Sequence, residues 1–242
     1  MYHNKEIKEG AIIISDAHYS HLRGELLEFI KAIDAKKITT PQLILMGDIF
    51  DMLFGGIPRT YKANKELIEL LNKLSQEIDI LYLEGNHDFK LQNIFPNITV
   101  VPIQQQPIAC SYHGKRVWLA HGDFDGDINY KRYTAFIRNR FVLFILNLIN
   151  MVFGNLILNK LDAYLAKKDD CKEIEKFEEL IKRRIEGVFE GDYFIEGHFH
   201  QNKSYRFQTL HYINLAAFAC NQRYFVVKSL QDKAIVEQKE FR

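Results

Sequence analysis

The sequence predicts a fold that mixes helices and strands, α/β (α+β), and three observations support this prediction. Short apolar runs alternate with segments of helical periodicity along most of the chain. Polar motifs rich in Asp, His and Asn directly follow five of the apolar runs. One long stretch, residues 130–190, has no strand-like run. With 242 residues, 47% of them hydrophobic, the chain is expected to form a single domain over residues 1–242 that includes a helical insertion.

The predicted strands are apolar runs bounded by polar or turn-forming residues. They are Ala11–Ser15, Leu43–Met46, Ile80–Leu83, Ile98–Tyr112, Arg116–Ala120, Tyr193–Ile195, Tyr212–Leu215, Tyr224–Leu230 and Ala234–Gln238. We expect the fourth and fifth to be joined by the turn His113–Gly114–Lys115. The last two are expected to form a hairpin over Gln231–Asp232–Lys233.

Two segments before residue 80 have the periodicity of amphipathic helices. In Leu22–Ile33 the apolar residues recur at intervals of three and four. In Lys62–Ile78 the leucines at 67, 70, 71 and 74 lie on one side of a helix. Tyr130–Glu190 is expected to be helical throughout, and its segment Phe141–Leu158 has no charge, with 14 apolar residues of 18.

Charge and cysteine content indicate a cytoplasmic protein. The net charge of +1 gives no global attraction to nucleic acid, and the chain has no basic groove with interleaved aromatic residues. The first ten residues are polar and do not resemble a secretory signal. Cys110, Cys171 and Cys220 are far apart in the sequence, so we expect three reduced thiols rather than a disulfide framework.

The polar motifs at the strand ends contain the ligand types of a metal site. They are Ser15–Asp16–Ala17–His18, Gly47–Asp48–Ile49–Phe50–Asp51, Gly85–Asn86–His87–Asp88, His121–Gly122–Asp123 and Gly197–His198–Phe199–His200. Carboxylate, imidazole and amide oxygen suit Mn²⁺, Fe or Zn²⁺, and the lack of thiolates argues against a structural zinc site. Each motif alone is also compatible with a solvated loop or a packed turn. Their joint occurrence at strand ends favours one shared site.

In this order the motifs resemble the calcineurin-like metallophosphoesterase family, whose pattern is Asp-x-His, Gly-Asp-x-x-Asp, Gly-Asn-His-Asp, a later His and Gly-His-x-His. The resemblance extends from Asp16 to His200. It implies a sandwich of two mixed β-sheets between helices. It also implies two divalent metal ions, Mn²⁺ first and Fe or Zn²⁺ as alternatives, which activate water and polarise a phosphoryl group.

Carried over residue by residue, the resemblance implies two sets of metal ligands joined by Asp48 as a bridge. One set is Asp16, His18 and His200, and the other is Asn86, His121 and His198. His87 would act on the phosphoryl or leaving oxygen, with Asp88 orienting it from behind. Asp51 would support the ligands without binding metal. The remaining histidines, His3, His21, His113 and His211, are interpreted as surface or structural residues.

Within that family the chain is most similar to the UDP-2,3-diacylglucosamine pyrophosphatases of lipid A synthesis. Chain length, the His121–Gly122–Asp123 form and the helical insertion carry this likeness. It implies cleavage of a UDP-linked diacylated sugar to UMP and a lipid monophosphate. Because His87 stands where that subfamily usually has Arg, a general phosphodiesterase or phosphoprotein phosphatase remains an alternative. A non-catalytic binding scaffold is a lesser one, since no ligand is missing.

The uncharged segment Phe141–Leu158 is long enough to span a bilayer, yet His121 before it and His198 after it are expected to bind the same metal. We therefore expect it to fold against the domain or to lie in the membrane interface at the cytoplasmic face, flanked by Arg138, Arg140 and Lys160. It is interpreted either as packed helices or a dimer face, or as an acyl-chain cap. The cap residues would be Phe141, Phe144, Ile145, Leu148 and Phe153.

Overall fold

Three consecutive isoleucines show how the layers of the molecule are built. In the computed structural model, which describes residues 5–229 and 235–241, strand β2 (Ile12–Ile14) is buried on both faces. Ile12 and Ile14 face a core shared with helices, whereas Ile13 faces a core shared with a second sheet. Burial on both faces explains why this strand is a continuous apolar run rather than an alternating one.

Two mixed six-stranded sheets pack face to face across the core that contains Ile13. The first has the order β14 (Val236–Glu240), β13 (Arg223–Val227), β2, β3 (Gln42–Leu45), β5 (Asp79–Leu83) and β7 (Thr99–Val101). The second has the order β1 (Lys5–Glu6), β8 (Ile108–Tyr112), β9 (Lys115–Ala120), β10 (Tyr193–Glu196), β12 (Leu210–Asn214) and β11 (Lys203–Phe207).

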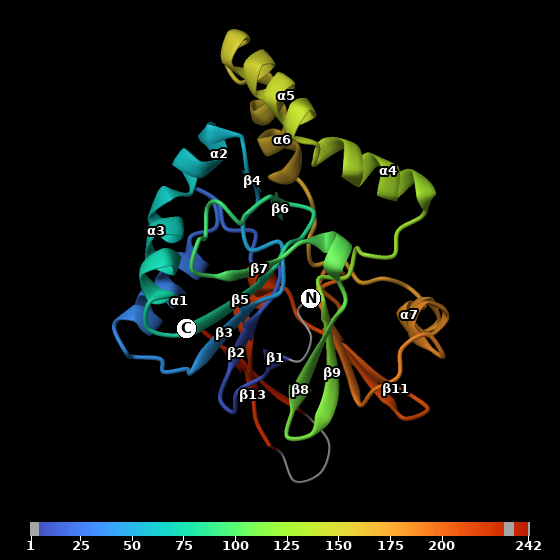
Figure 1. Ribbon diagram of the computed structural model, residues 1–242. Coiled ribbons are helices and arrows are strands. Elements are labelled where there is room, and N and C mark those ends of the chain that lie inside the picture. The colour runs from blue at the N-terminus through green and yellow to red at the C-terminus, as the bar shows by residue number, and fades with distance from the viewer. Residues whose placement is uncertain (1–4, 230–234, 242) are drawn as a thin grey trace.

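Helices cover the outer faces of both sheets (Figure 1). On the first sheet, α1 (Glu25–Asp34) and α3 (Lys65–Leu74) bury side chains such as Phe29 and Leu71 against β2 and β3. On the second sheet, α7 (Phe177–Ile185) buries Phe177 and Ile181. This arrangement confirms the predicted α/β class with two mixed sheets between helices.

The predicted strand Ile98–Tyr112 is wrong, because the chain divides there between the two sheets. β7 belongs to the first sheet and β8 to the second, with a 3₁₀ turn at Ile103–Gln105 between them. Pro102 and Pro107 border this turn. Neither proline has an N–H group to continue a strand ladder, which explains the break.

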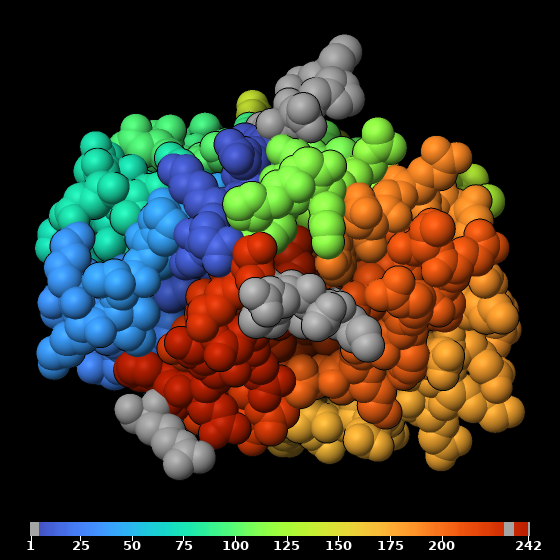
Figure 2. Space-filling view, turned by 90° about the horizontal axis from the view of Figure 1, so that it is seen from below, coloured from blue at the N-terminus to red at the C-terminus, as the bar shows by residue number. Residues whose placement is uncertain are grey.

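Several short elements were not predicted, because two to six residues give no periodicity to detect. They are β1, β11, the pair β4 (Leu53–Phe54) and β6 (Asp88–Phe89), α2 (Pro58–Ala63) and α8 (Phe218–Asn221). The predicted pairing of the last two strands is confirmed, since β13 and β14 are antiparallel. Their turn at 231–233 lies outside the described residues. Figure 2 shows these C-terminal strands beside the N-terminal segment, in agreement with the pairing of β13 with β2.

Between residues 128 and 185, all of which the structure describes, the chain forms helices and no strands, as predicted for residues 130–190. Before α7 come α4 (Ile128–Ile137), α5 (Arg140–Val152) and α6 (Leu156–Leu165), and α5 and α6 stand out from one end of the sandwich (Figure 1). None of the described helices alone has the length and hydropathy to cross a membrane. Only α4 and α5 taken together do, and they are bent by 61°.

The expectation of three reduced thiols is wrong. Cys171 and Cys220 form a disulfide between Cα atoms 5.8 Å apart, whereas Cys110 is a buried free thiol. The separation of 49 positions between the paired cysteines conceals the pairing in the sequence. The fold brings the segment before α7 onto α8, and this proximity creates the bond.

Candidate metal centre

The five polar motifs converge where strands of both sheets end. β2, β3 and β5 run parallel in the first sheet, and β9 and β10 run parallel in the second. A contact across the two sheets fixes their relative position, because Nδ1 of His121, after β9, lies 2.9 Å from the carbonyl oxygen of Met46, after β3. The turns that follow these strands therefore meet in one place, as expected for an α/β site.

Asp16, His18 and His200 form the first cluster, with one potential ligand atom from each within 4.8 Å of the others. Nε2 of His200 lies 3.0 Å from Oδ1 of Asp16. The other ring nitrogen of His200 contacts the backbone carbonyl of Asp170, which fixes the orientation of the ring. All three residues belong to the set expected to bind one ion.

Asp48, His121 and His198 form the second cluster. Nε2 of His121 lies 3.4 Å from Oδ2 of Asp48 and 3.4 Å from Oδ1 of Asn86. The rings of His121 and His198 are 5.0 Å apart. The structure thus brings together every member of the second expected set, with Asp48 beside it.

A third group of potential ligands, His18, Asp51 and His87, shares His18 with the first cluster. Oδ1 of Asp51 is 3.3 Å from Nδ1 of His18, and Nε2 of His87 is 4.0 Å from Oδ2 of Asp48. His87 and His121 therefore both direct Nε2 toward the same carboxylate oxygen of Asp48.

Asp88 does not orient His87, contrary to expectation. Its buried carboxylate accepts hydrogen bonds from the backbone N–H groups of Asp48, Ile49, Phe50 and Gly85 and from the hydroxyl of Tyr82. Consecutive residues of an extended segment point in opposite directions, so Asp88 faces away from His87. Nδ1 of His87 instead lies 2.9 Å from the carbonyl oxygen of Asp51. Asp88 therefore joins the turn after β3 to the turn after β5.

Five of the seven expected ligands have left-handed backbone conformations. They are Asp16 (φ 51°), His18 (45°), Asp48 (49°), His198 (63°) and His200 (60°). This conformation is uncommon for residues other than glycine and costs on the order of 1–3 kcal/mol each. Strain of this kind persists only where the surroundings fix the backbone, and it accumulates at functional sites.

Glycine at two of the turns permits their close approach. A Cβ atom on Gly85 would overlap Oδ1 of Asp48, and one on Gly197 would overlap Oδ2 of Asp16. No side chain fits at either position, so these turns require glycine.

The chemistry of the buried donors suits divalent cations. His18 is fully buried, and neither of its ring nitrogens has a hydrogen-bond partner among the described residues, as a metal ligand would require. Burial opposes the ionisation of Asp48, yet His121 and His87 outweigh it and hold the pKa of Asp48 well below its usual range. Burial and the neighbouring His121 lower the pKa of His198 to about 4, so its imidazole is neutral and able to coordinate metal.

The carboxylates of both clusters attract positive charge. Although burial lowers the pKa of His121, the Asp48 carboxylate overcomes this effect and raises that pKa well above its usual value. Asp16 acts in the same way on the pKa of His200. Divalent ions would supply the positive charge that these buried carboxylates otherwise draw from protonated histidines. The residues present therefore fit two metal ions.

A family model described as calcineurin-like phosphoesterase matches residues 11–202, which contain all five motifs. The chain belongs to this family. It is thus a hydrolase of the metallophosphoesterase class, and the clusters above lie where its metal site is expected.

Curated relatives of this phosphoesterase include several proteins named UDP-2,3-diacylglucosamine hydrolase. The protein from Aliivibrio fischeri is 23% identical over 205 residues, which cover 81% of this chain and 83% of the relative. The protein from Photorhabdus laumondii is 24% identical over 199 residues, covering 78% and 81%. Among solved structures, an archaeal phosphodiesterase aligns with a TM-score of 0.45 and 12% identity over 95% of this chain and 98% of its own.

An apolar cavity of about 430 Å³ opens beside Asn86 and His87. The helices α4, α5 and α6 form its far walls, through residues such as Ile137, Leu146 and Leu161. The five residues predicted for an acyl-chain cap lie on or beside α5 but do not face this cavity. Phe141, Phe144, Ile145, Leu148 and Phe153 are 71%, 61%, 37%, 47% and 64% exposed, and none of them lines this cavity.

A buried ionic group that was not predicted from the sequence connects α7 to the metal centre. Arg184 of α7 forms an ion pair with Glu196 at 2.7 Å and with Asp125 at 2.7 Å. Its Nη2 donates to the carbonyl oxygen of Gly122 at 3.0 Å. Arg184 therefore holds the turns after β9 and β10, which carry His121 and His198. Sequence gives no signal for this group, since its members are distant in the chain.

Proposed function

We propose that this phosphoesterase cleaves the pyrophosphate of UDP-2,3-diacylglucosamine, releasing UMP and a lipid monophosphate. The observation that carries the proposal is the apolar cavity beside Asn86 and His87. A phosphate-cleaving centre that opens directly onto an apolar cavity suits a substrate with a pyrophosphate next to acyl chains. The names of the curated relatives support the same substrate class.

In this proposal the two ligand sets hold one divalent ion each, Mn²⁺ being preferred. Asp16, His18 and His200 would hold the first ion, Asn86, His121 and His198 would hold the second, and Asp48 would be shared between them. Such ions supply Lewis-acid chemistry, which polarises phosphoryl oxygens and activates water. The chain's own contribution is to hold the ligands rigidly through the strained turns and the Asp88 hydrogen bonds.

We assign to His87 a hydrogen bond to a phosphoryl oxygen, or proton donation to the leaving oxygen. It lines the apolar cavity and also lies 4.0 Å from Asp48, so it sits between the cavity and the metal clusters. Its contact with the Asp51 carbonyl uses Nδ1 and leaves Nε2 directed toward the centre. A group in this position acts on the substrate rather than on a distant part of the fold.

Rates on acylated and deacylated substrates test the proposal. Each buried methylene contributes about 0.8 kcal/mol. Three methylenes in the cavity would therefore raise kcat/KM roughly 60-fold over that of the deacylated UDP-sugar. Leu146→Asp, on the cavity wall, should abolish this preference and leave the hydrolysis of p-nitrophenyl phosphate esters intact.

Leu148→Asp is the matched control, because Leu148 lies on the same helix but is 47% exposed and outside the cavity. It should retain the preference for the acylated substrate. Circular dichroism of both variants must show a folded protein. Equal rates of the wild-type protein on both substrates would reject the acyl-sugar proposal. A general phosphodiesterase or phosphoprotein phosphatase would then remain, an alternative favoured by His87 at the position where the lipid-sugar subfamily usually has Arg.

We also propose that the outward face of α5 contacts the membrane from the cytoplasmic side. Phe141, Met151 and Phe153 are 64–71% exposed on or beside this helix, Arg140 at its start is exposed, and Lys160 is exposed on the following helix α6. Arg138 does not share this role, because it is buried. Co-sedimentation with anionic vesicles that is lost in Phe141→Ser/Phe153→Ser would support the contact, and unchanged sedimentation would reject it.

A further inference from the structure

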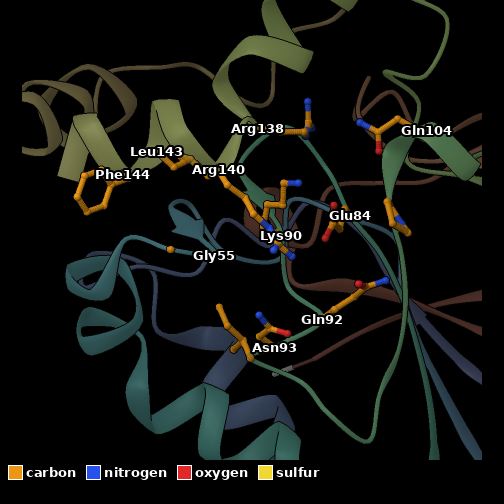
Figure 3. Close-up of a pocket in the computed structure, with 13 residues that line it drawn as sticks. Gly55, Glu84, Lys90, Gln92, Asn93, Gln104, Arg138, Arg140, Leu143 and Phe144 are labelled. Carbon is orange, nitrogen blue, oxygen red and sulfur yellow. The ribbon is translucent and has the colours of Figure 1, made fainter. Parts of the chain in front are cut away.

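A second cavity, of about 540 Å³, is lined by Glu84 and Lys90, which lie on either side of the turn with Asn86 and His87 (Figure 3 shows Glu84 and Lys90). Neither Asn86 nor His87 lines it. Its walls come from the segments 90–94 and 102–104 and from the start of α5. Leu143 alone lines both this cavity and the apolar one, so the two are separate spaces with different chemistry.

Positive charge dominates this second cavity. Lys90, Arg138 and Arg140 line it, and Glu84 is the one carboxylate among its lining residues. The formal charge of the lining is thus three minus one, or +2. Glu84 already accepts a hydrogen bond from the backbone N–H of Leu91 at 2.9 Å. In Figure 3 the side chains of Lys90 and Arg140 extend toward the centre of the cavity.

Arg138 is a buried cation with unused donors. It is 3% exposed, and its guanidinium lies over the ring of Phe89 at 4.9 Å. Nη2 donates to the carbonyl oxygen of Gly85 at 2.9 Å, whereas Nε and Nη1 have no hydrogen-bond partner among the described residues. Buried charges are normally compensated, because an uncompensated one costs several kcal/mol. Glu84, which lines the same cavity, interacts electrostatically with Arg138 and offsets part of its charge, so the attraction for an anion comes from Arg138 together with Lys90 and Arg140.

The remaining lining residues indicate a ligand that is larger than an inorganic anion. Gln92, Asn93 and Gln104 offer amide groups, and Ile94 and Phe144 offer apolar surface. A volume of about 540 Å³ falls in the range of small-molecule sites and exceeds that of an inorganic ion. The cavity is therefore suited to a molecule with a phosphate group at one end and hydrogen-bonding groups at the other.

We propose that this cavity is a second anion site, separate from the metal centre, which binds the phosphate group of a phosphomonoester. Such a group belongs to soluble nucleoside monophosphates and to the headgroup of phosphatidic acid. The cavity is open to a soluble ligand, and it adjoins the exposed apolar residue Phe144 of α5, a position that also suits a lipid headgroup. The site requires no metal, and it does not depend on which phosphoester the catalytic centre cleaves.

Titration calorimetry of the Mn²⁺-loaded protein with UMP tests the soluble source. The wild type should show two binding events, one at the metal centre and one in the cavity. Lys90→Asn/Arg140→Gln should weaken only the second, by roughly ten- to a hundredfold, because charged hydrogen bonds are lost. Asparagine is chosen because Lys90 has φ 61°, a conformation that asparagine tolerates.

Vesicles of phosphatidylcholine with and without phosphatidic acid test the lipid source. Lys131→Ala/Arg132→Ala is the matched control, since both residues are exposed and neither lines the cavity. Loss of UMP binding or of phosphatidic acid binding in the cavity variant alone supports the site and identifies its source. Unchanged binding of both ligands, or an equal loss in the control pair, overturns the proposal. Melting temperature and metal content should match in all three proteins.

Discussion

Replacing Arg184 by methionine removes the cation that joins α7 to the metal-site turns. Its Nη1 lies 2.7 Å from Glu196, whose side chain is 0% exposed, and its own side chain is 12% exposed. Methionine keeps most of the volume and none of the charge. The variant leaves the carboxylate of Glu196 with the hydroxyl of Tyr212, at 2.7 Å, as its side-chain partner.

The expected loss is large because the ion pair is buried. Removing one partner of such a pair typically costs about 3–5 kcal/mol. In a chain of this length each kcal/mol lowers the melting temperature by about 2–4 °C, so we expect a decrease of roughly 6–20 °C. Since Arg184 also binds the carbonyl of Gly122, between His121 and Asp123, we expect metal affinity to fall by roughly 10–100-fold.

Chemical denaturation of the wild type, Arg184→Met, Glu196→Gln and the double variant measures the coupling. The double variant should be more stable than Arg184→Met alone, because it no longer buries an unpaired charge. Arg183→Met is the matched control on the same helix, where the arginine is exposed and should change stability by under about 0.5 kcal/mol. The reasoning is refuted if Arg184→Met is as mild as this control or if the two single effects simply add.

Three further outcomes are expected. His87→Ala should keep both metal ions by elemental analysis while kcat falls by roughly 10²–10⁴, and loss of an ion would make His87 a ligand instead. Titration with a thiol reagent should find no reactive thiol in the native protein, because Cys110 is buried and burial raises its pKa to about 12. It should find one thiol after denaturation and three after reduction, whereas three without reductant would exclude the disulfide. Cys171→Ser should lower stability by up to about 4 kcal/mol in thermal unfolding, since the bond closes a loop of 49 residues, and an unchanged unfolding transition would contradict this role.

The strand ends and the residues gathered there were predictable, because both follow from local patterns. A continuous apolar run such as Ile12–Ile14 indicates a buried strand, and parallel strands bring the residues after them to one edge. Asp16 and His200 meet for this reason although 184 positions separate them. The contact between His200 and the carbonyl of Asp170 was not predictable, since a backbone group carries no sequence signal.

The face of α5 that lines the apolar cavity was not predictable, for a physical reason. This helix is apolar on nearly all sides, so its periodicity does not distinguish the inward face with Leu143 and Leu146 from the outward face with Phe144 and Leu148. Only packing against β6, through the contact of Leu143 with Phe89, decides which face is covered. Asp88 was misassigned for a related reason, because sequence adjacency to His87 does not imply contact in an extended segment.

Locating the metal ions by anomalous diffraction from crystals grown with Mn²⁺ tests the central claim most directly. The account predicts two peaks per chain, one among Asp16, His18 and His200 and the other among Asn86, His121 and His198, with Asp48 in contact with both. A single peak, or peaks outside these two clusters, would contradict a two-metal centre at the strand ends.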